Sequence, residues 1–104
     1  EPCGLSQFYS FAYGSIPIVR RSGGLADTVT DYNPVYRRQG TANGFAFVPL
    51  TSKSLQQRME QAITLYDDPA EFTRVQAAGM KLDYSWDKSR DAYVELYRKC
   101  VEAA

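Results

Sequence analysis

The chain has 104 residues, enough for one small domain, with an ordinary apolar share of 44% and a formal net charge of zero. This charge balance argues against a surface for nucleic acid, and no apolar run is long enough to predict a membrane partner. The sequence has no histidine, which excludes a histidine base or ligand here, and its two cysteines, Cys3 and Cys100, are too few for a secreted disulfide scaffold.

The first nine residues predict a tight turn followed by a helix. Apolar side chains recur in this helix at the spacing of one buried face: Leu5, Phe8, Tyr9 and Ala12. Gly14 follows where a left-handed residue would end the helix. The backbone amides of Gly4, Leu5 and Ser6 would lie at the helix start, where unpaired N–H groups and the helix dipole favour a phosphate. Because Gly4 has no Cβ, a ligand could approach its backbone closely.

A buried strand is predicted at residues 16–19, which are apolar and partly β-branched. Gly23 and Gly24 then form a turn that enters a second short helix ending near Val29. Helix, strand, turn and helix make most of a βαβ unit whose first strand is missing. Because ligands of open α/β sheets bind beyond the carboxyl ends of the strands, we expect the Gly4 turn and the Gly23–Gly24 turn to share that edge.

Residues 31–44 contain many turn residues and no steady period, which predicts a surface loop. A second short strand is predicted at residues 45–48, and Pro49 ends it because proline cannot donate to a strand ladder. Two strands form a sheet that is marginal in water. We therefore expect this chain to be a fragment, completed by strands from upstream sequence.

Three helices are predicted in the remainder. The first would bury a face made of Leu55, Met59, Ala62, Ile63 and Tyr66. In the second, Asp68 is the expected cap and Pro69 the first residue, with Phe72, Val75 and Ala78 or Gly79 facing inward. In the third, Ser85 is the expected cap, and the buried stripe would comprise Trp86, Tyr93, Leu96, Tyr97 and Cys100.

The opening motif Glu1-Pro2-Cys3-Gly4-Leu5, followed by residues 13–29, resembles the bacterial glycogen synthase and plant starch synthase family. The segment Tyr84-Ser85-Trp86 is similar too, so that the resemblance covers essentially the whole chain. It implies a retaining glycosyltransferase of the two-domain GT-B architecture. Such enzymes move glucose from ADP-glucose or UDP-glucose to the non-reducing end of an α-1,4-glucan.

The fold class that the resemblance implies is α/β: the C-terminal part of a Rossmann-like parallel-sheet domain, followed by C-terminal helices. Residues 1–104 would form part of the nucleotide-sugar-binding domain, with its upstream strands and the N-terminal domain absent. The implied partners are the nucleotide-sugar donor, the α-glucan acceptor and that N-terminal domain. No cofactor and no metal is implied. The expected location is the cytoplasm of a bacterium, or the plastid if the source is a plant.

Glu1 by residue type alone is a solvated acid that favours the helix dipole. The resemblance instead implies a catalytic glutamate that hydrogen-bonds the donor sugar. Many related enzymes have a second glutamate where this chain has Tyr9, which leaves the contact to the nucleotide ribose unassigned and places Tyr9 with Gly23 and Gly24 as a possible wall of the nucleotide cleft. Cys3 could be a nucleophile, but no base lies nearby in the sequence, so that packing or a donor-site wall is the favoured role.

The resemblance also gives roles to the backbone amides of Gly4, Leu5 and Ser6, which would hold the distal phosphate of the departing nucleotide. Charge develops there as the glycosidic bond breaks, so fixed donors stabilise the transition state more than the ground state. Two alternatives stay open. One is another GT-B glucosyltransferase, of the sucrose or trehalose type, and the other is a stand-alone nucleotide-binding or interaction module without catalysis.

Overall fold

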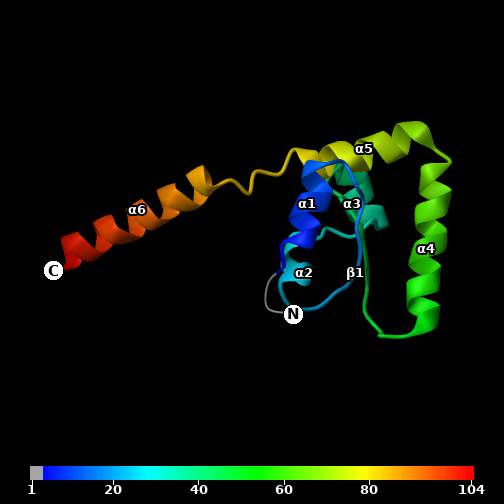
Figure 1. Cartoon of the computed structure of the whole chain (residues 1–104), viewed down its shortest axis with the longest axis horizontal. Coiled ribbons are helices and arrows are strands. Elements are labelled where there is room, and N and C mark those ends of the chain that lie inside the picture. The colour runs from blue at the N-terminus through cyan, green and yellow to red at the C-terminus, as the bar shows by residue number, and fades with distance from the viewer. Residues whose placement is uncertain (1–3) are drawn as a thin grey trace.

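A computed structural model describes residues 4–104 of the chain. The elements follow in the order α1 (Ser6–Ala12), β1 (Ile18–Arg20), α2 (Gly23–Thr28), α3 (Pro34–Gln39), β2 (Phe45–Phe47), α4 (Ser52–Tyr66), α5 (Pro69–Met80) and α6 (Trp86–Ala103). Figure 1 shows α1 to α5 gathered around the strands, whereas α6 extends away from them at the end of a non-helical segment. None of the helices within residues 4–104 is long and apolar enough to cross a membrane.

The two strands pair in parallel, with Ile18 opposite Phe45 and Arg20 opposite Phe47. The α/β class with a parallel sheet is therefore confirmed, although β1 begins two residues later than the sequence predicts. The connection between the strands contains α2 and α3, as parallel pairing requires a crossover. Because both strands run the same way, their carboxyl ends share one edge.

The hydrophobic core forms where α4 and α5 meet the sheet. Phe45 is fully buried, and Leu65 of α4 and Val75 of α5 pack with it. The inward face predicted for α5 is confirmed, since Val75 and Gly79 are buried. The predicted cap is confirmed as well, because the Asp68 side chain accepts the Glu71 N–H.

Helix α1 packs against α5, but with a different face from the predicted one. Gln7 and Phe11 are its buried residues, whereas Leu5 and Tyr9 are 59% and 61% exposed. The contact is close because Gly79 has no side chain: a Cβ there would lie 2.9 Å from Phe11 Cδ1. Gly14 does adopt the expected left-handed conformation, with a φ of 76°.

The predicted loop at residues 31–44 contains a helix, α3, so that prediction was wrong. The Asn33 side chain accepts the N–H groups of Val35 and Tyr36, Pro34 is the first helical residue, and Gly40 ends the helix with a φ of 73°. These end signals were present in the sequence. The helix is too short to show an apolar period between them.

The inward face of α4 also differs from the prediction. Leu65 is buried, whereas Met59, Ile63 and Tyr66 of the predicted stripe are exposed. The helix is instead oriented by Arg58, whose guanidinium pairs with Asp31 at 3.0 Å. The spacing from Arg58 through Ala62 to Leu65 places these three side chains on one face.

Helix α6 has no buried residue among those described, so the predicted buried stripe is exposed in this structure. Trp86 is 83% exposed and Tyr97 is 66% exposed. Ser85 is the N-cap residue, as predicted, but its side chain makes no capping bond. An apolar period identifies the face that a partner would bury, and every residue of α6 is exposed within residues 4–104.

Candidate functional site

The start of α1 carries three of the predicted site residues. Leu5 is the N-cap residue, and its apolar side chain makes no capping hydrogen bond. Leu5 and Ser6 are exposed, and Gly4 is partly exposed. Glu1 and Cys3, the predicted catalytic residue and donor-site wall, lie outside the described residues. The structure thus places the amide-bearing part of the predicted site at an accessible helix start.

The glycine turn lies directly beyond the carboxyl end of β1. Gly23 has a φ of 51°, a conformation that glycine adopts without strain. The N-cap residue Ser22 makes no side-chain capping bond, as at α1. The strands pair up to this turn, since the Arg21 N–H donates to the Phe47 carbonyl at 2.8 Å. Gly23 and Gly24 therefore stand at the sheet edge where α/β proteins bind ligands.

A partly buried hydrogen bond joins the two predicted parts of the site. Gln7 Nε2, in the first turn of α1, donates to Thr28 Oγ1 at the end of α2 over 3.4 Å. Thr28 Oγ1 in turn donates to the Gly24 carbonyl over 2.8 Å. Gln7 was not among the predicted site residues, because a glutamine is not expected on a buried face. The spacing from Gln7 to Phe11 was the signal that could have revealed that face.

Tyr9 was predicted as a possible wall of the nucleotide cleft. Its side chain is 61% exposed on α1. It lies on a different face of the helix from Gln7 and Phe11, which are 3% exposed. The structure therefore brings α1 and α2 together through Gln7 and not through Tyr9.

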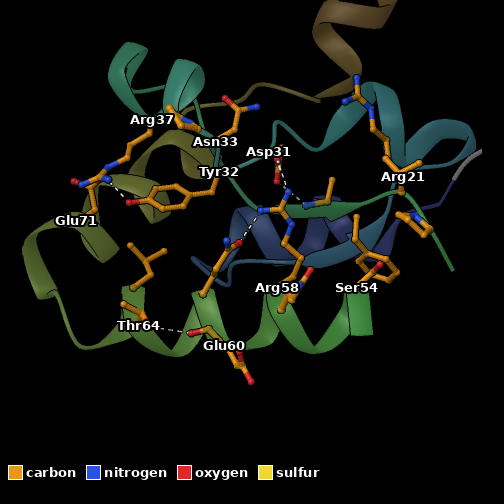
Figure 2. A pocket seen from close by; sticks show the side chains of 18 of the residues that line it. Arg21, Asp31, Tyr32, Asn33, Arg37, Ser54, Arg58, Glu60, Thr64 and Glu71 are labelled. Carbon is orange, nitrogen blue, oxygen red and sulfur yellow. Dashed lines mark hydrogen bonds and ion pairs between the residues drawn. The ribbon is translucent and has the colours of Figure 1, made fainter. Parts of the chain in front are cut away.

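A separate hollow of about 1150 Å³ opens between α4, α5 and β2, as Figure 2 shows. Among its residues, Asp31 accepts the Ala46 N–H at 2.9 Å and pairs with Arg58, whose other nitrogen donates to Gln61 at 2.7 Å. None of the predicted site residues that the structure describes lines this hollow. Its cross-links instead hold α4 against the strands.

The far end of the same hollow is closed by Tyr32, Arg37 and Glu71. The Tyr32 hydroxyl donates to Glu71 Oε1 at 3.0 Å, and Arg37 lies 3.3 Å from the same carboxylate oxygen. Burial, followed by the Glu71 carboxylate, raises the pKa of the Tyr32 hydroxyl above its ordinary value. Within residues 4–104, no group of three or more His, Cys, Asp or Glu side chains could hold a metal ion.

Sequence comparison finds similar proteins, although no protein-family model matches the chain. It is 46% identical over 101 residues to a glycogen synthase of Thioalkalivibrio sulfidiphilus, which covers 97% of this chain and 21% of that protein. It is 46% identical over 98 residues to a glycogen synthase of Mesorhizobium japonicum, covering 94% of this chain and 20% of that protein.

The fold has a counterpart in the catalytic domain of starch synthase IV from Arabidopsis thaliana, a structure bound to ADP and acarbose. The TM-score is 0.82 at 36% identity, over 98% of this chain and 21% of that one. The chain thus spans about one fifth of the length of the proteins it matches. Over that segment, in sequence and in fold, it is related to the glycogen and starch synthases.

Proposed function

We propose that this chain is the C-terminal part of the nucleotide-sugar-binding domain of a glycogen or starch synthase. The whole protein would transfer glucose, with retention, from ADP-glucose or UDP-glucose to the non-reducing end of an α-1,4-glucan. One observation carries the proposal. Nearly the whole chain is similar, in sequence and in fold, to segments of proteins named for this activity, including a catalytic domain that was bound to ADP and acarbose.

The backbone amides of Gly4, Leu5 and Ser6 would hold the distal phosphate of the nucleotide. Support comes from the start of α1, which is accessible and where the Leu5 side chain makes no capping bond. Helices α2 and α6 also have no side-chain capping bond, whereas α3, α4 and α5 begin with capping side chains, from Asn33, Thr51 and Asp68. Amide donors fixed at this place would stabilise the negative charge that develops on the leaving phosphate.

Gly23 and Gly24 would form the second wall of the donor cleft, at the carboxyl edge of the sheet. Tyr9 would line the cleft as well, with its exposed ring close to the nucleotide. Cys3 would line the donor side without covalent chemistry. Glu1 would hydrogen-bond the reacting glucose, as the resemblance of the opening motif implies.

The rest of the domain would cover the apolar faces that residues 4–104 leave exposed. On α4 this face comprises Leu55, Met59, Ile63 and Tyr66. On α6 it includes Trp86 and Tyr97. Burying a large apolar side chain contributes about 1.5–3 kcal/mol, so covering these two faces would add substantially to stability. The N-terminal domain of the whole enzyme is the proposed source of the glucan-binding surface.

Glu1→Gln in the full-length protein tests the catalytic assignment. The substitution keeps the shape of the side chain and removes the charge that would stabilise the positively charged sugar ring. We expect kcat to fall about 100-fold, near 2.7 kcal/mol, with a much smaller change in the donor KM. Glu102→Gln is the matched control, because Glu102 is an exposed glutamate on α6. The measurement is steady-state glucosyl transfer, with folding checked by circular dichroism.

Two results would count against the proposal in different ways. A folded Glu1→Gln variant with normal kcat would remove Glu1 from the chemistry and leave the transferase assignment intact. A folded full-length protein that binds a nucleotide but transfers glucose from neither ADP-glucose nor UDP-glucose would favour the module without catalysis.

A further inference from the structure

Gln7 is a buried polar residue in the part of α1 that the proposed donor site uses. It is 3% exposed, as buried as the core residue Phe11 one turn later. Burying a side-chain amide is unfavourable unless its polar atoms find partners. Its Nε2 donates to Thr28 Oγ1 at 3.4 Å, across 21 positions of sequence. A non-polar side chain of similar size would fill the same space without this need, so the amide points to a directional role.

The Thr28 hydroxyl that accepts this bond is itself held in one orientation. Its hydroxyl hydrogen is directed at the Gly24 carbonyl, 2.8 Å away and one turn earlier in α2. The oxygen is therefore left as the acceptor for Gln7. The two bonds form a short relay from the first turn of α1, through the end of α2, to the carbonyl of Gly24 in the glycine turn.

The other end of α1 is fixed by different contacts. Phe11 packs on Gly79 of α5, and Gln76 Nε2 donates to the Gly14 carbonyl at 2.8 Å. These contacts hold the carboxyl end of α1 against α5. The amino-terminal turn of α1 has the Phe8 ring 4.3 Å from the Tyr84 ring, and its directional contact with α2 is the Gln7–Thr28 bond.

We propose that Gln7 is a positioning residue, which acts through Thr28 to fix the start of α1 relative to the Gly23–Gly24 turn. The inference rests on the proposed function, in which these two segments form opposite walls of a site for a nucleoside diphosphate sugar. Gln7 touches no ligand, because its side chain is buried between the helices. Its effect is to hold the two walls at the separation that the diphosphate requires.

The test is a double-mutant cycle in the full-length protein, read out as ADP affinity by calorimetry. Gln7→Leu and Thr28→Val each remove one partner at nearly constant volume. Because a neutral hydrogen bond contributes about 0.5–1.5 kcal/mol, we expect each substitution to weaken ADP binding by about threefold to tenfold. The double variant should bind no more weakly than the weaker single variant, because both substitutions remove the same interaction.

Thr28→Ser is the matched control, since it keeps both the acceptor for Gln7 and the donor to Gly24. Its Kd for ADP should lie within about twofold of that of the parent protein, a much smaller change than the tenfold step that corresponds to about 1.4 kcal/mol. A role limited to folding stability would lower the unfolding temperature of the variants and leave the ADP affinity of the folded protein unchanged. If Gln7→Leu fails to fold, the comparison of Thr28→Val with Thr28→Ser tests the same bond.

The outcomes separate this inference from the proposed function. Loss of affinity in Thr28→Val, its retention in Thr28→Ser and a non-additive double variant support the positioning role. Full ADP affinity in a folded Thr28→Val variant, or additive losses in the cycle, would overturn it while the transferase assignment stands. A folded parent protein with no affinity for ADP or UDP would overturn both.

Discussion

Removing the carboxylate of Asp31 should loosen β2. One oxygen of Asp31 accepts the Ala46 N–H at 2.9 Å, and the other pairs with Arg58 at 3.0 Å. Ala46 is 6% exposed, so its amide would have little access to water as a substitute partner. In Asp31→Ala, the buried Ala46 N–H would lose its partner, and the Arg58 guanidinium, which is only 23% exposed, would keep Gln61 alone.

The expected size follows from these two losses. A hydrogen bond to a charged group contributes about 1.5–3 kcal/mol, and the partly screened ion pair adds about 1 kcal/mol or less. We therefore expect the free energy of opening around β2 to fall by about 3 kcal/mol. Since about 1.4 kcal/mol is a factor of ten, the Ala46 amide should exchange its hydrogen about 100-fold faster or more.

Native-state hydrogen exchange in the full-length protein measures this opening directly. Asp31→Asn keeps an acceptor for the Ala46 N–H and removes the charge, so it should have a smaller effect, about 1 kcal/mol. Asp27→Ala is the control for loss of an aspartate at the surface, because Asp27 is an exposed aspartate on α2. Unchanged exchange at Ala46 in Asp31→Ala, or equal acceleration in the Asn and Ala variants, would refute the reasoning.

Two further substitutions test packing and titration. Gly44→Ala would place a Cβ 2.8 Å from both the Pro17 carbonyl oxygen and Val29 Cγ1, so we expect a loss of about 1–3 kcal/mol, measured as a lower Tm. An unchanged Tm would show that the backbone at Pro17 can give way. The pKa of Tyr32 is raised above 10.0, so its contribution to stability is complete below pH 10.0 and is lost as the pH rises through the folded-state pKa. Tyr32→Phe should therefore lose less stability than the parent protein in alkaline unfolding, and equal alkaline losses would contradict the assignment.

Local signals in the sequence were sufficient for several elements. The helices α2 and α5 and the strand β2 were predicted close to their observed bounds. The reason is that turn and cap chemistry acts within a few residues, as Asp68 and Pro69 do at the start of α5. The same rules apply to α3, whose start is marked by Asn33 and Pro34 and whose end is marked by Gly40. The prediction of a loop relied instead on the lack of an apolar period.

The family relationship was also readable from the sequence alone. The opening motif and the glycine turn carry it, and the comparisons support it over nearly the whole chain. The roles of Glu1, Cys3 and the amides near Gly4 stay predictions, because they depend on a bound donor. The hypothesis about their chemistry comes from the sequence. The structure adds that the start of α1, where Leu5 and Ser6 lie, is accessible.

Which face of a helix is buried was decided by the tertiary structure. Periodicity identifies an apolar stripe but not the surface that covers it, so most of the stripes predicted to be buried on α1, α4 and α6 are exposed within residues 4–104. The faces that do turn inward carry bonds between distant residues: Gln7 of α1 bonds Thr28, and Arg58 of α4 bonds Asp31, across 21 and 27 positions. No local pattern encodes such pairs, because each partner is an ordinary polar residue until the strands bring the two segments together.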